Sequence, residues 1–321
     1  MTDLIITNGD SAADLLAEAG KSGRILPWRD VLHEGPILAE LDDCTMARVG
    51  YLAERFRIAA ADVAADFAVR DAIIKAHGGF DRVELWFEHD LYDQLQLLQI
   101  LAFFAGSDRR DRLILVQADD FLGRQRADTI LRFAGKARPI GIEDLDLGRD
   151  VWRHLASPSP ATIADWLNDP DERLPYLRPA LLRFFQELPA PGSGLGRTEM
   201  TALRALANGP AAMVDVFRAV LADEEAPFMG DSSVFRLIED MALADAPLIA
   251  GLAPPDATAD EERYADARLE LTIAGEDVLN GEDDNIALNG IDRWWAGTHL
   301  TPASVWRYDR HRARLVAPSE N

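Results

Sequence analysis

The sequence predicts an α/β protein: a Rossmann-like parallel sheet with flanking helices, then a helical segment and a winged-helix-like C-terminal domain. Short runs of Val, Leu and Ile alternate with segments of helical spacing in the first 140 residues. This alternation is typical of a parallel sheet covered by helices. A Pro/Gly-rich break follows at 189–196. We therefore predict an α/β ligand-binding domain at 1–140, a helical extension at 141–190 and a winged-helix-like domain with an aromatic tail at 191–321.

Four strands and four helices are expected in the first part. Each predicted strand is a short apolar run bounded by turns or charges, as buried parallel strands often are, and the helices carry apolar residues three or four apart. The strands are Leu4–Thr7, Arg24–Pro27, Val83–Phe87 and Leu113–Val116, and the helices are Ser11–Ala19, Thr45–Phe56, Ala61–His77 and a crossover helix through Leu91, Leu95, Leu98 and Ala102. In the extension, helical spacing is strongest at Leu174–Leu188.

Three helices and two strands are expected after the break. The helices are Thr198–Ala207, Ala211–Leu221 and Ser232–Ala244, and the strands are Pro247–Ala250 and Arg268–Thr272, joined by the acidic and flexible Pro254–Glu262. This order predicts a winged helix. Its third helix carries Arg236 among acidic residues, which suits a DNA major groove poorly and favours a protein partner. The Gly-Ser-Gly-Leu-Gly run in the break follows no predicted strand, so it is not a nucleotide fingerprint.

Composition and charge exclude several classes of protein. With 48% hydrophobic and 27% charged residues, the chain resembles an ordinary globular protein. The lone Cys44 excludes an intrachain disulfide and fits a reducing cytoplasm, and no signal peptide or membrane-spanning run is expected. The net charge is −22, and 11 basic against 23 acidic residues from Ser193 onward leave 22 against 32 before it. Because neither half concentrates Lys and Arg, nucleic acid is a disfavoured partner.

Polar residues directly follow three of the predicted strands. These loops are Asn8–Ser11, Trp28–Pro36 and Glu88–Gln94. In an open parallel sheet, the loops at the carboxyl ends of the strands line one crevice, where ligands bind. The sequence therefore predicts a site for a small-molecule ligand at this edge of the sheet.

The first loop has two interpretations. Asp10 or Ser11 would cap the exposed backbone N–H groups of the helix that follows. Alternatively, an anion or a metal-bound phosphate lies at that helix N-terminus. Asp10 would repel a bare phosphate but would hold Mg²⁺ for it.

The second loop gathers ionisable groups within a few residues. His33 would act as a general base or a metal ligand, with Glu34 or Asp30 orienting its second nitrogen. Trp28 is either core or a wall of the pocket, and Arg29 either pairs with Asp30 or binds the ligand.

The third loop offers a histidine between acids. Asp90 and Asp93 form a variant capping box or bind the ligand with Gln94, whereas His89 is either a core histidine or an acid/base. N and O ligands of this kind would bind Zn²⁺, Mn²⁺ or Fe²⁺. The candidate ligands of a divalent metal cofactor are Asp10, Asp30, His33, His89 and Asp90, although their spacing matches no strong metal signature.

Weaker candidates lie outside these loops. Arg48 and Arg55 share one helix face and either reach an anionic ligand or form surface salt bridges. Gln117 ends the last strand and would read a ligand's hydrogen-bonding edge. Near the C-terminus, Asn289–His299 and Trp306–Asp309 hold three of the seven tryptophans. They indicate a tail packed across the domain interface, or a closure of the crevice by Arg293 and Trp294.

The three loops carry a family resemblance. Asn8–Ser11, Trp28–Pro36 and Leu85–Leu95 resemble the bacterial family catalogued as domain of unknown function 1835, and the match covers roughly the first third of the chain. The segments Pro227–Asp231, Leu271–Gly275 and Asn289–Trp294 are similar to the C-terminal part of such proteins. The resemblance supports the boundaries of the motifs and implies no catalytic residues.

Two functional classes stay open. The first is an enzyme acting on a small phosphorylated or nucleotide-like substrate, with a centre formed by Asp10, Asp30, His33, Glu34, His89 and Asp90. The second is a non-catalytic regulator or adaptor that senses a small ligand and contacts a protein through its winged-helix-like domain. Turnover of a bound ligand would distinguish the two.

Overall fold

The fold was described from a computed structural model that covers residues 2–108, 112–255 and 260–318. The chain forms two compact units. The first comprises residues 1–182 and 296–298, and the second comprises 183–295 and 299–321. Each unit is described separately below. The division falls before the Pro/Gly-rich break, so the domain boundaries drawn from the sequence stay a prediction.

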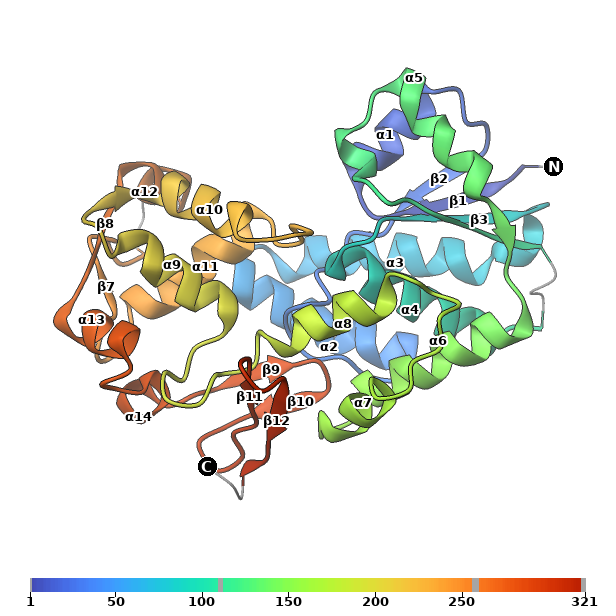
Figure 1. Ribbon diagram of the computed structural model, residues 1–321. Coiled ribbons are helices and arrows are strands. Elements are labelled where there is room, and N and C mark those ends of the chain that lie inside the picture. The colour runs from blue at the N-terminus through green and yellow to red at the C-terminus, as the bar shows by residue number, and fades with distance from the viewer. Residues whose placement is uncertain (1, 109–111, 256–259, 319–321) are drawn as a thin grey trace. The chain divides into compact units, whose positions relative to one another are not determined.

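A five-stranded, mostly parallel sheet organises the first unit (Figure 1). Its strands are β1 (Leu4–Thr7), β2 (Arg24–Pro27), β3 (Val83–Phe87), β4 (Leu113–Gln117) and β5 (Arg138–Pro139). Their order is β2-β1-β3-β4-β5, with parallel pairs throughout except for the antiparallel β5 at the edge. The predicted α/β class and the four parallel strands are confirmed, whereas β5 was not predicted because its two residues have no apolar pattern.

Helices cover both faces of this sheet (Figure 1). The α-helices of the first part of the chain are α1 (Asp10–Glu18), α2 (Leu41–Phe56), α3 (Ala60–Lys75), α4 (Leu91–Ala105), α5 (Ala127–Ile130), α6 (Ile142–Leu155), α7 (Ala161–Trp166) and α8 (Leu177–Phe185), the last of which runs across the division between the units. Three short 3₁₀ helices lie at His77–Gly79, Leu122–Arg124 and Leu131–Lys136. Ile5, Trp86 and Val116 of the sheet pack against α1 and α5 on one face.

The other face is covered by α4, which packs along α6 (Figure 1). Leu95, Leu98 and Leu101 of α4 are fully buried, and so are most of its other side chains. A helix that is apolar all round is a core helix. The two helices approach closely where a Cβ on Gly148 of α6 would lie 2.4 Å from the Cβ of Leu101. The predicted crossover helix is thereby confirmed and is the centre of the core.

The second unit combines helices with short strands. Its elements are α9 (Arg197–Leu206), β6 (Ala211–Ala212), α10 (Met213–Ala222), α11 (Asp231–Ala242), β7 (Ile249–Ala250), α12 (Asp260–Asp266), β8 (Arg268–Leu271), α13 (Ile273–Asn280), α14 (Asn285–Asn289), β9 (Arg293–Trp295), β10 (Thr298–Leu300), β11 (Arg307–Asp309) and β12 (Arg314–Val316). The three predicted helices and two strands are present, but Ala211 and Ala212, predicted as the start of the second helix, form β6 instead. The two strands form a three-stranded antiparallel sheet with β6, in the order β6-β8-β7.

The acidic connection predicted at Pro254–Glu262 is only partly described. Residues 256–259 of the acidic connection lie outside the described residues, and α12 begins directly after them. Within the described ranges, none of the helices combines the length and apolar character needed to cross a lipid bilayer.

Candidate functional site

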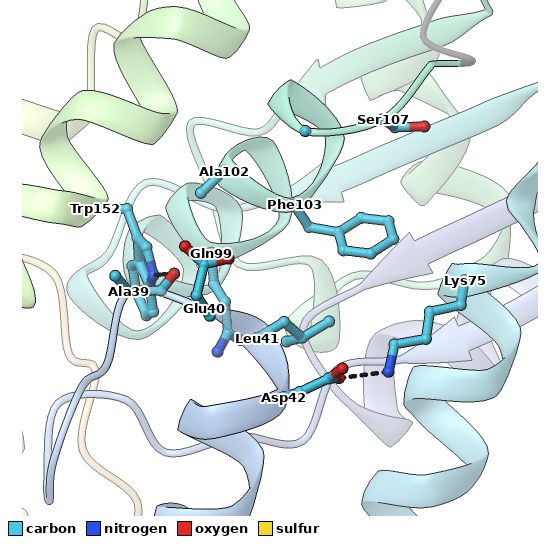
Figure 2. A pocket seen from close by; sticks show the side chains of 11 residues that line it. Ala39, Glu40, Leu41, Asp42, Lys75, Gln99, Ala102, Phe103, Ser107 and Trp152 are labelled. Carbon is cyan, nitrogen blue, oxygen red and sulfur yellow. Dashed lines mark hydrogen bonds and ion pairs between the residues drawn. The ribbon is translucent and has the colours of Figure 1, made fainter.

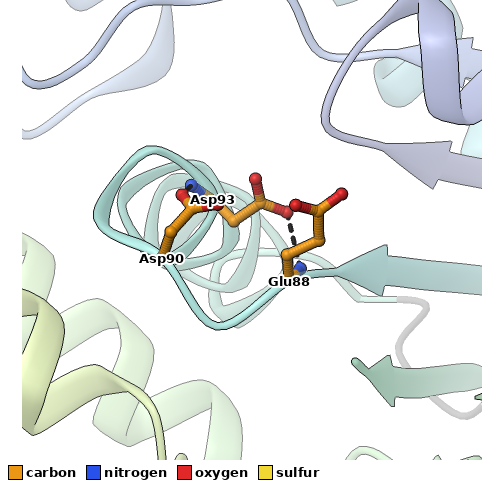
Figure 3. A group of neighbouring side chains, drawn as sticks. All are labelled: Glu88, Asp90 and Asp93. Carbon is orange, nitrogen blue, oxygen red and sulfur yellow. Dashed lines mark hydrogen bonds between the residues drawn. The ribbon is translucent and has the colours of Figure 1, made fainter. Parts of the chain in front are cut away.

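Three carboxylates come together where β3 meets α4 (Figure 3). Glu88, Asp90 and Asp93 each offer one oxygen, and these atoms lie within 4.8 Å of one another. The side chains are buried, with exposed fractions of 3%, 4% and 0%. We call this group the acidic cluster. In the described part of the chain, it is the one group of acidic, His and Cys side chains that is compact enough to hold a metal ion.

The backbone turn from strand to helix builds the cluster. Asp90 caps α4, because its carboxylate accepts a hydrogen bond from the backbone N–H of Asp93 at 3.1 Å. The Asp93 carboxylate in turn accepts the backbone N–H of Glu88 at 2.6 Å. The predicted N-cap role of Asp90 is therefore confirmed, but the predicted capping box is wrong, because the Asp93 carboxylate reaches the backbone N–H of Glu88 and not that of Asp90. This hydrogen bond holds the backbone of Glu88 next to the Asp93 carboxylate.

Asn8 joins the cluster from the end of β1. Its side-chain Nδ2 donates to Glu88 Oε1 at 3.0 Å and to Asp93 Oδ2 at 2.8 Å. From the loop after β4, the backbone N–H of Leu122 donates to the same Glu88 oxygen at 2.5 Å. The cluster thus lies between β1 and β3, where the strand order reverses. Ligands of open α/β sheets bind at such a switch point.

Basic side chains do little to balance these acids: the charge of Arg124 lowers the pKa of Glu88, but less than burial raises it. Among the described residues, no Lys or Arg forms an ion pair with Glu88, Asp90 or Asp93, and Asn8 and backbone amides are their donors. Burial, with the charge of Glu88 added, raises the pKa of Asp90 to about 8. Burial is also the main cause that raises the pKa of Asp93 and that of Glu88. A cluster of this kind keeps a proton near neutral pH or exchanges it for a cation.

His89 lies beside the cluster, between two aromatic rings. Its ring centroid is 5.0 Å from that of Phe121 and 6.0 Å from that of Tyr176. The side chain is half-buried, and burial lowers its pKa. Its Nδ1 has no hydrogen-bond partner among the described residues. The imidazole is therefore neutral at neutral pH and able to accept a proton.

The Trp28–Pro36 loop is organised by a buried arginine of α2. Arg48 Nε donates to Asp30 Oδ1 at 2.5 Å, and its terminal nitrogens donate to the carbonyls of Glu34 at 2.8 Å and Val31 at 2.9 Å. Arg70 of α3 adds a second contact to Asp30 at 3.4 Å. The predicted surface salt bridge is wrong for Arg48, which is fully buried because the loop wraps around it.

The remaining predicted residues of this loop also have protein partners. Arg55 donates to Glu34 Oε2 at 2.9 Å, and Glu34 Oε1 lies 3.8 Å from His33 Nε2. Trp28 is core, since it is fully buried and its Nε1 donates to Gln99 Oε1 at 2.9 Å. The loop thus forms a wall beside α4, to which Gln99 belongs.

At the first loop, the capping interpretation is wrong. Gly9 is the N-cap of α1, and no side chain makes a capping hydrogen bond there. Asp10 is instead the first residue of the helix and accepts from Arg29, 2.8 Å from its Nε, which lowers the pKa of Asp10. Asp10, Ser11 and Arg29 are exposed. They lie on the surface next to Asn8, whereas Asn8 itself turns to the acidic cluster.

The structure thus brings together a subset of the predicted site residues. Asn8, Asp90 and Asp93 converge, and Gln94 joins them because its Nε2 donates to the carbonyl of Glu88 at 2.6 Å. Of the predicted metal ligands, Asp90 belongs to the cluster, while Asp10, Asp30, His33 and His89 do not. Sequence reasoning missed Glu88 as a site residue. Its signal was an acid placed directly after a fully buried strand.

A second pocket lies away from these acids (Figure 2). It has a volume of about 370 Å³ and is lined by Trp152, Gln99, Phe103 and the exposed Asp42–Lys75 ion pair. The last turn of α4 forms part of its wall, about 18 Å along the helix from the first turn. None of the three predicted site loops lines it, although Ala39 and Glu40 of the connection from β2 to α2 do.

The aromatic residues near the C-terminus contact partners within the second unit. Trp295 stacks on Phe184 with ring centroids 4.5 Å apart, and Trp294 stacks on His299 at the same distance. Arg293 donates to Glu199 of α9 at 2.9 Å. Closure of the crevice by Arg293 and Trp294 stays a prediction.

Comparison with known proteins adds no relative: no protein-family model matches the chain, and no curated protein matches it.

Proposed function

We propose that the first unit is an enzyme that binds a divalent cation at the acidic cluster and acts on a small phosphorylated or nucleotide-like substrate. The observation that carries the proposal is a group of three buried carboxylates without a basic partner among the described residues, at the switch point between β1 and β3. Buried charges are normally paired or bound to a metal. Among the described residues, these carboxylates have no ion-pair partner, so a bound metal would balance their charge.

The donor set fits a hard cation. Carboxylate oxygens are the ligands that Mg²⁺ and Mn²⁺ prefer, and such ions usually complete their shell with water and substrate phosphate. Glu88, Asp90 and Asp93 would hold the ion, and its chemistry would be to neutralise charge on a phosphate. Asn8 orients two of the three carboxylates through its amide hydrogens. His89 would accept a proton from the substrate or from water, since its imidazole is neutral.

We further assign the sheet to the Rossmann-like class and the second unit to the winged-helix class. The strand order β2-β1-β3-β4 with crossover helices supports the first assignment. The order α9, β6, α10, α11, β7, β8 with a three-stranded antiparallel sheet supports the second. Membership of the domain-of-unknown-function family 1835 is part of the same proposal.

The second candidate function is a ligand-sensing adaptor. The observation that favours it is α11, the counterpart of a DNA-reading helix. Its Arg236 is buried and pairs with Glu239 at 2.7 Å and with Asp260 of α12 at 2.5 Å. A helix whose cation is used internally presents no basic surface to phosphates. A winged-helix-like unit of this kind would contact protein.

Metal binding tests the proposal directly. Calorimetric titration with MgCl₂ and MnCl₂ at pH 8 should show binding to the wild type and none to Asp90→Asn. Asp128→Asn is the matched control, because its carboxylate is exposed and pairs with Arg126. Equal binding by both variants, or none by the wild type, would refute the metal site.

Turnover then separates enzyme from adaptor. A panel of phosphate monoesters and nucleotides is incubated with the metal-loaded protein, and released phosphate is measured. We expect release by the wild type and by Asp128→Asn, and none by Asp90→Asn. Saturable binding of a panel member without any product over a long incubation would favour the adaptor.

A further inference from the structure

A pocket with basic lining opens at the carboxyl end of β4, one strand away from the acidic cluster. Its volume is about 330 Å³, and its polar lining consists of Gln117, Lys136, Arg138, Glu172, Arg173 and Tyr176. All of these residues belong to the first unit. We call it the β4–β5 pocket. Three basic side chains and one acid line the pocket, and each basic group also pairs with a carboxylate outside the lining.

The basic groups are of two kinds. Arg138 is fixed, since its two terminal nitrogens donate to Asp144 at 3.0 and 2.9 Å. Lys136 pairs with Asp119 at the surface, where the two side chains are 43% and 58% exposed. Arg173 pairs with Asp171 in the same way, with 47% and 33% exposed. Exposed ion pairs contribute about 0–1 kcal/mol, so a multivalent anion would compete for Lys136 and Arg173.

Gln117 gives a second, independent indication of a ligand. Its Nε2 is buried and has no hydrogen-bond partner among the described residues. A buried donor left unsatisfied is costly, and a turn of the amide into the pocket would let an oxygen of a bound ligand satisfy it. A donor beside basic groups selects an acceptor with negative charge. Gln117 was predicted from its position at a strand end to read a ligand; Lys136, Arg138 and Arg173 were not.

The pocket lies next to the proposed active site. Gln117 pairs in register with Phe87, the residue before Glu88. Tyr176, which lines the pocket, is also the ring against which His89 packs. The two sites differ in what they offer an anion: three carboxylates repel it, whereas the β4–β5 pocket presents Lys136 and Arg173, for which an anion competes with Asp119 and Asp171.

We propose that the β4–β5 pocket is an anion subsite that binds a phosphate group of the substrate without the aid of a metal. This inference deepens the proposed function and rests on it for the identity of the bound molecule as a substrate. Lys136 and Arg173 supply charge, Gln117 supplies a directional donor, and Arg138 shapes the floor. The phosphate bound here would direct the neighbouring part of the substrate toward His89 and the acidic cluster.

The probe is inorganic pyrophosphate, titrated by calorimetry in a chelator that removes divalent ions and at constant ionic strength. The double variant Lys136→Gln, Arg173→Gln should bind at least tenfold more weakly than the wild type. Gln117→Leu, which leaves the charge unchanged, should bind several-fold more weakly. The charge-matched control is Lys75→Gln, Arg126→Gln, which removes two surface-paired cations outside the β4–β5 pocket. The control should bind like the wild type.

Three results would overturn the subsite: no binding by the wild type, equal binding by all four proteins, or equal weakening in the control. Asp90→Asn separates this inference from the proposed function, since it should lose metal binding and keep pyrophosphate binding. A wild type that binds pyrophosphate but no metal would refute the metal site alone. A wild type that binds metal, with pyrophosphate affinity unchanged by the pocket variants, would refute the subsite alone.

Discussion

Asp30 and the acidic cluster are both buried in the first unit, but their electrostatic surroundings are opposite. Asp30 is fully buried and contacts both Arg48 and Arg70. Glu88, Asp90 and Asp93 are equally buried, yet hydrogen bonds from Asn8 and backbone amides replace the arginines. Burial of a carboxylate therefore does not by itself distinguish a structural acid from a functional one. The presence or absence of a cation does.

The largest effect of a substitution on stability is expected at Asp30. Asp30→Asn removes the charge that compensates two buried guanidinium groups, and we expect a loss of about 3 kcal/mol in the free energy of unfolding. The matched control is Asp66→Asn, whose carboxylate pairs with Arg29 but is 41% exposed. It should change stability by less than about 0.5 kcal/mol. Urea unfolding measures both, and similar midpoints for the two variants would contradict the comparison.

The acidic cluster should make the free energy of unfolding fall as pH rises. The pKa of Asp90 is about 8 in the folded chain, compared with an ordinary value of 3.8. Between these values the folded state binds the proton and the unfolded state does not, so stability falls as pH rises. The contribution is full below about pH 4 and is lost as pH rises through about 8.

Asp90→Asn isolates this effect, because an amide cannot ionise. Without metal, the wild type should lose about 4 kcal/mol relative to Asp90→Asn between pH 5 and pH 8.5, as measured by urea unfolding. A saturating divalent cation should reverse the trend at the higher pH, since it displaces the proton. Parallel stability curves for the two proteins in the absence of metal would show that Asp90 does not retain a proton.

A smaller effect is expected when the donor of the cluster is removed. Asn8→Ala takes away the amide hydrogens that reach Glu88 and Asp93, and we expect a loss of about 1–2 kcal/mol in the free energy of unfolding. The loss should grow with pH, because the carboxylates need these donors most when ionised. The control Asn168→Ala alters an exposed side chain and should be neutral. A cost at Asn8 that does not change with pH would indicate packing alone.

Local pattern was sufficient for much of the fold. The runs at β1, β2 and β3 predict strands with the observed bounds, and β4 extends one residue beyond its prediction. Each of these strands pairs with neighbours over most of its length, so its apolar run is long enough to be recognised. The edge strand β5 and the strand β6 each have two residues; β5 escaped prediction, and the residues of β6 were predicted as helix. Their pairing partners are distant in sequence and give no local signal.

The sequence by itself determined that acids, amides and imidazoles follow the strands at one edge of the sheet, but not which of them meet. Which of them are neutralised was decided only by tertiary structure. Arg48 and Arg70 reach Asp30 from two different helices, across 18 and 40 residues of chain, while Asn8 reaches Glu88 across 80. The charge of a buried acid depends on what lies within a few ångströms of it, and sequence neighbours alone do not specify those groups.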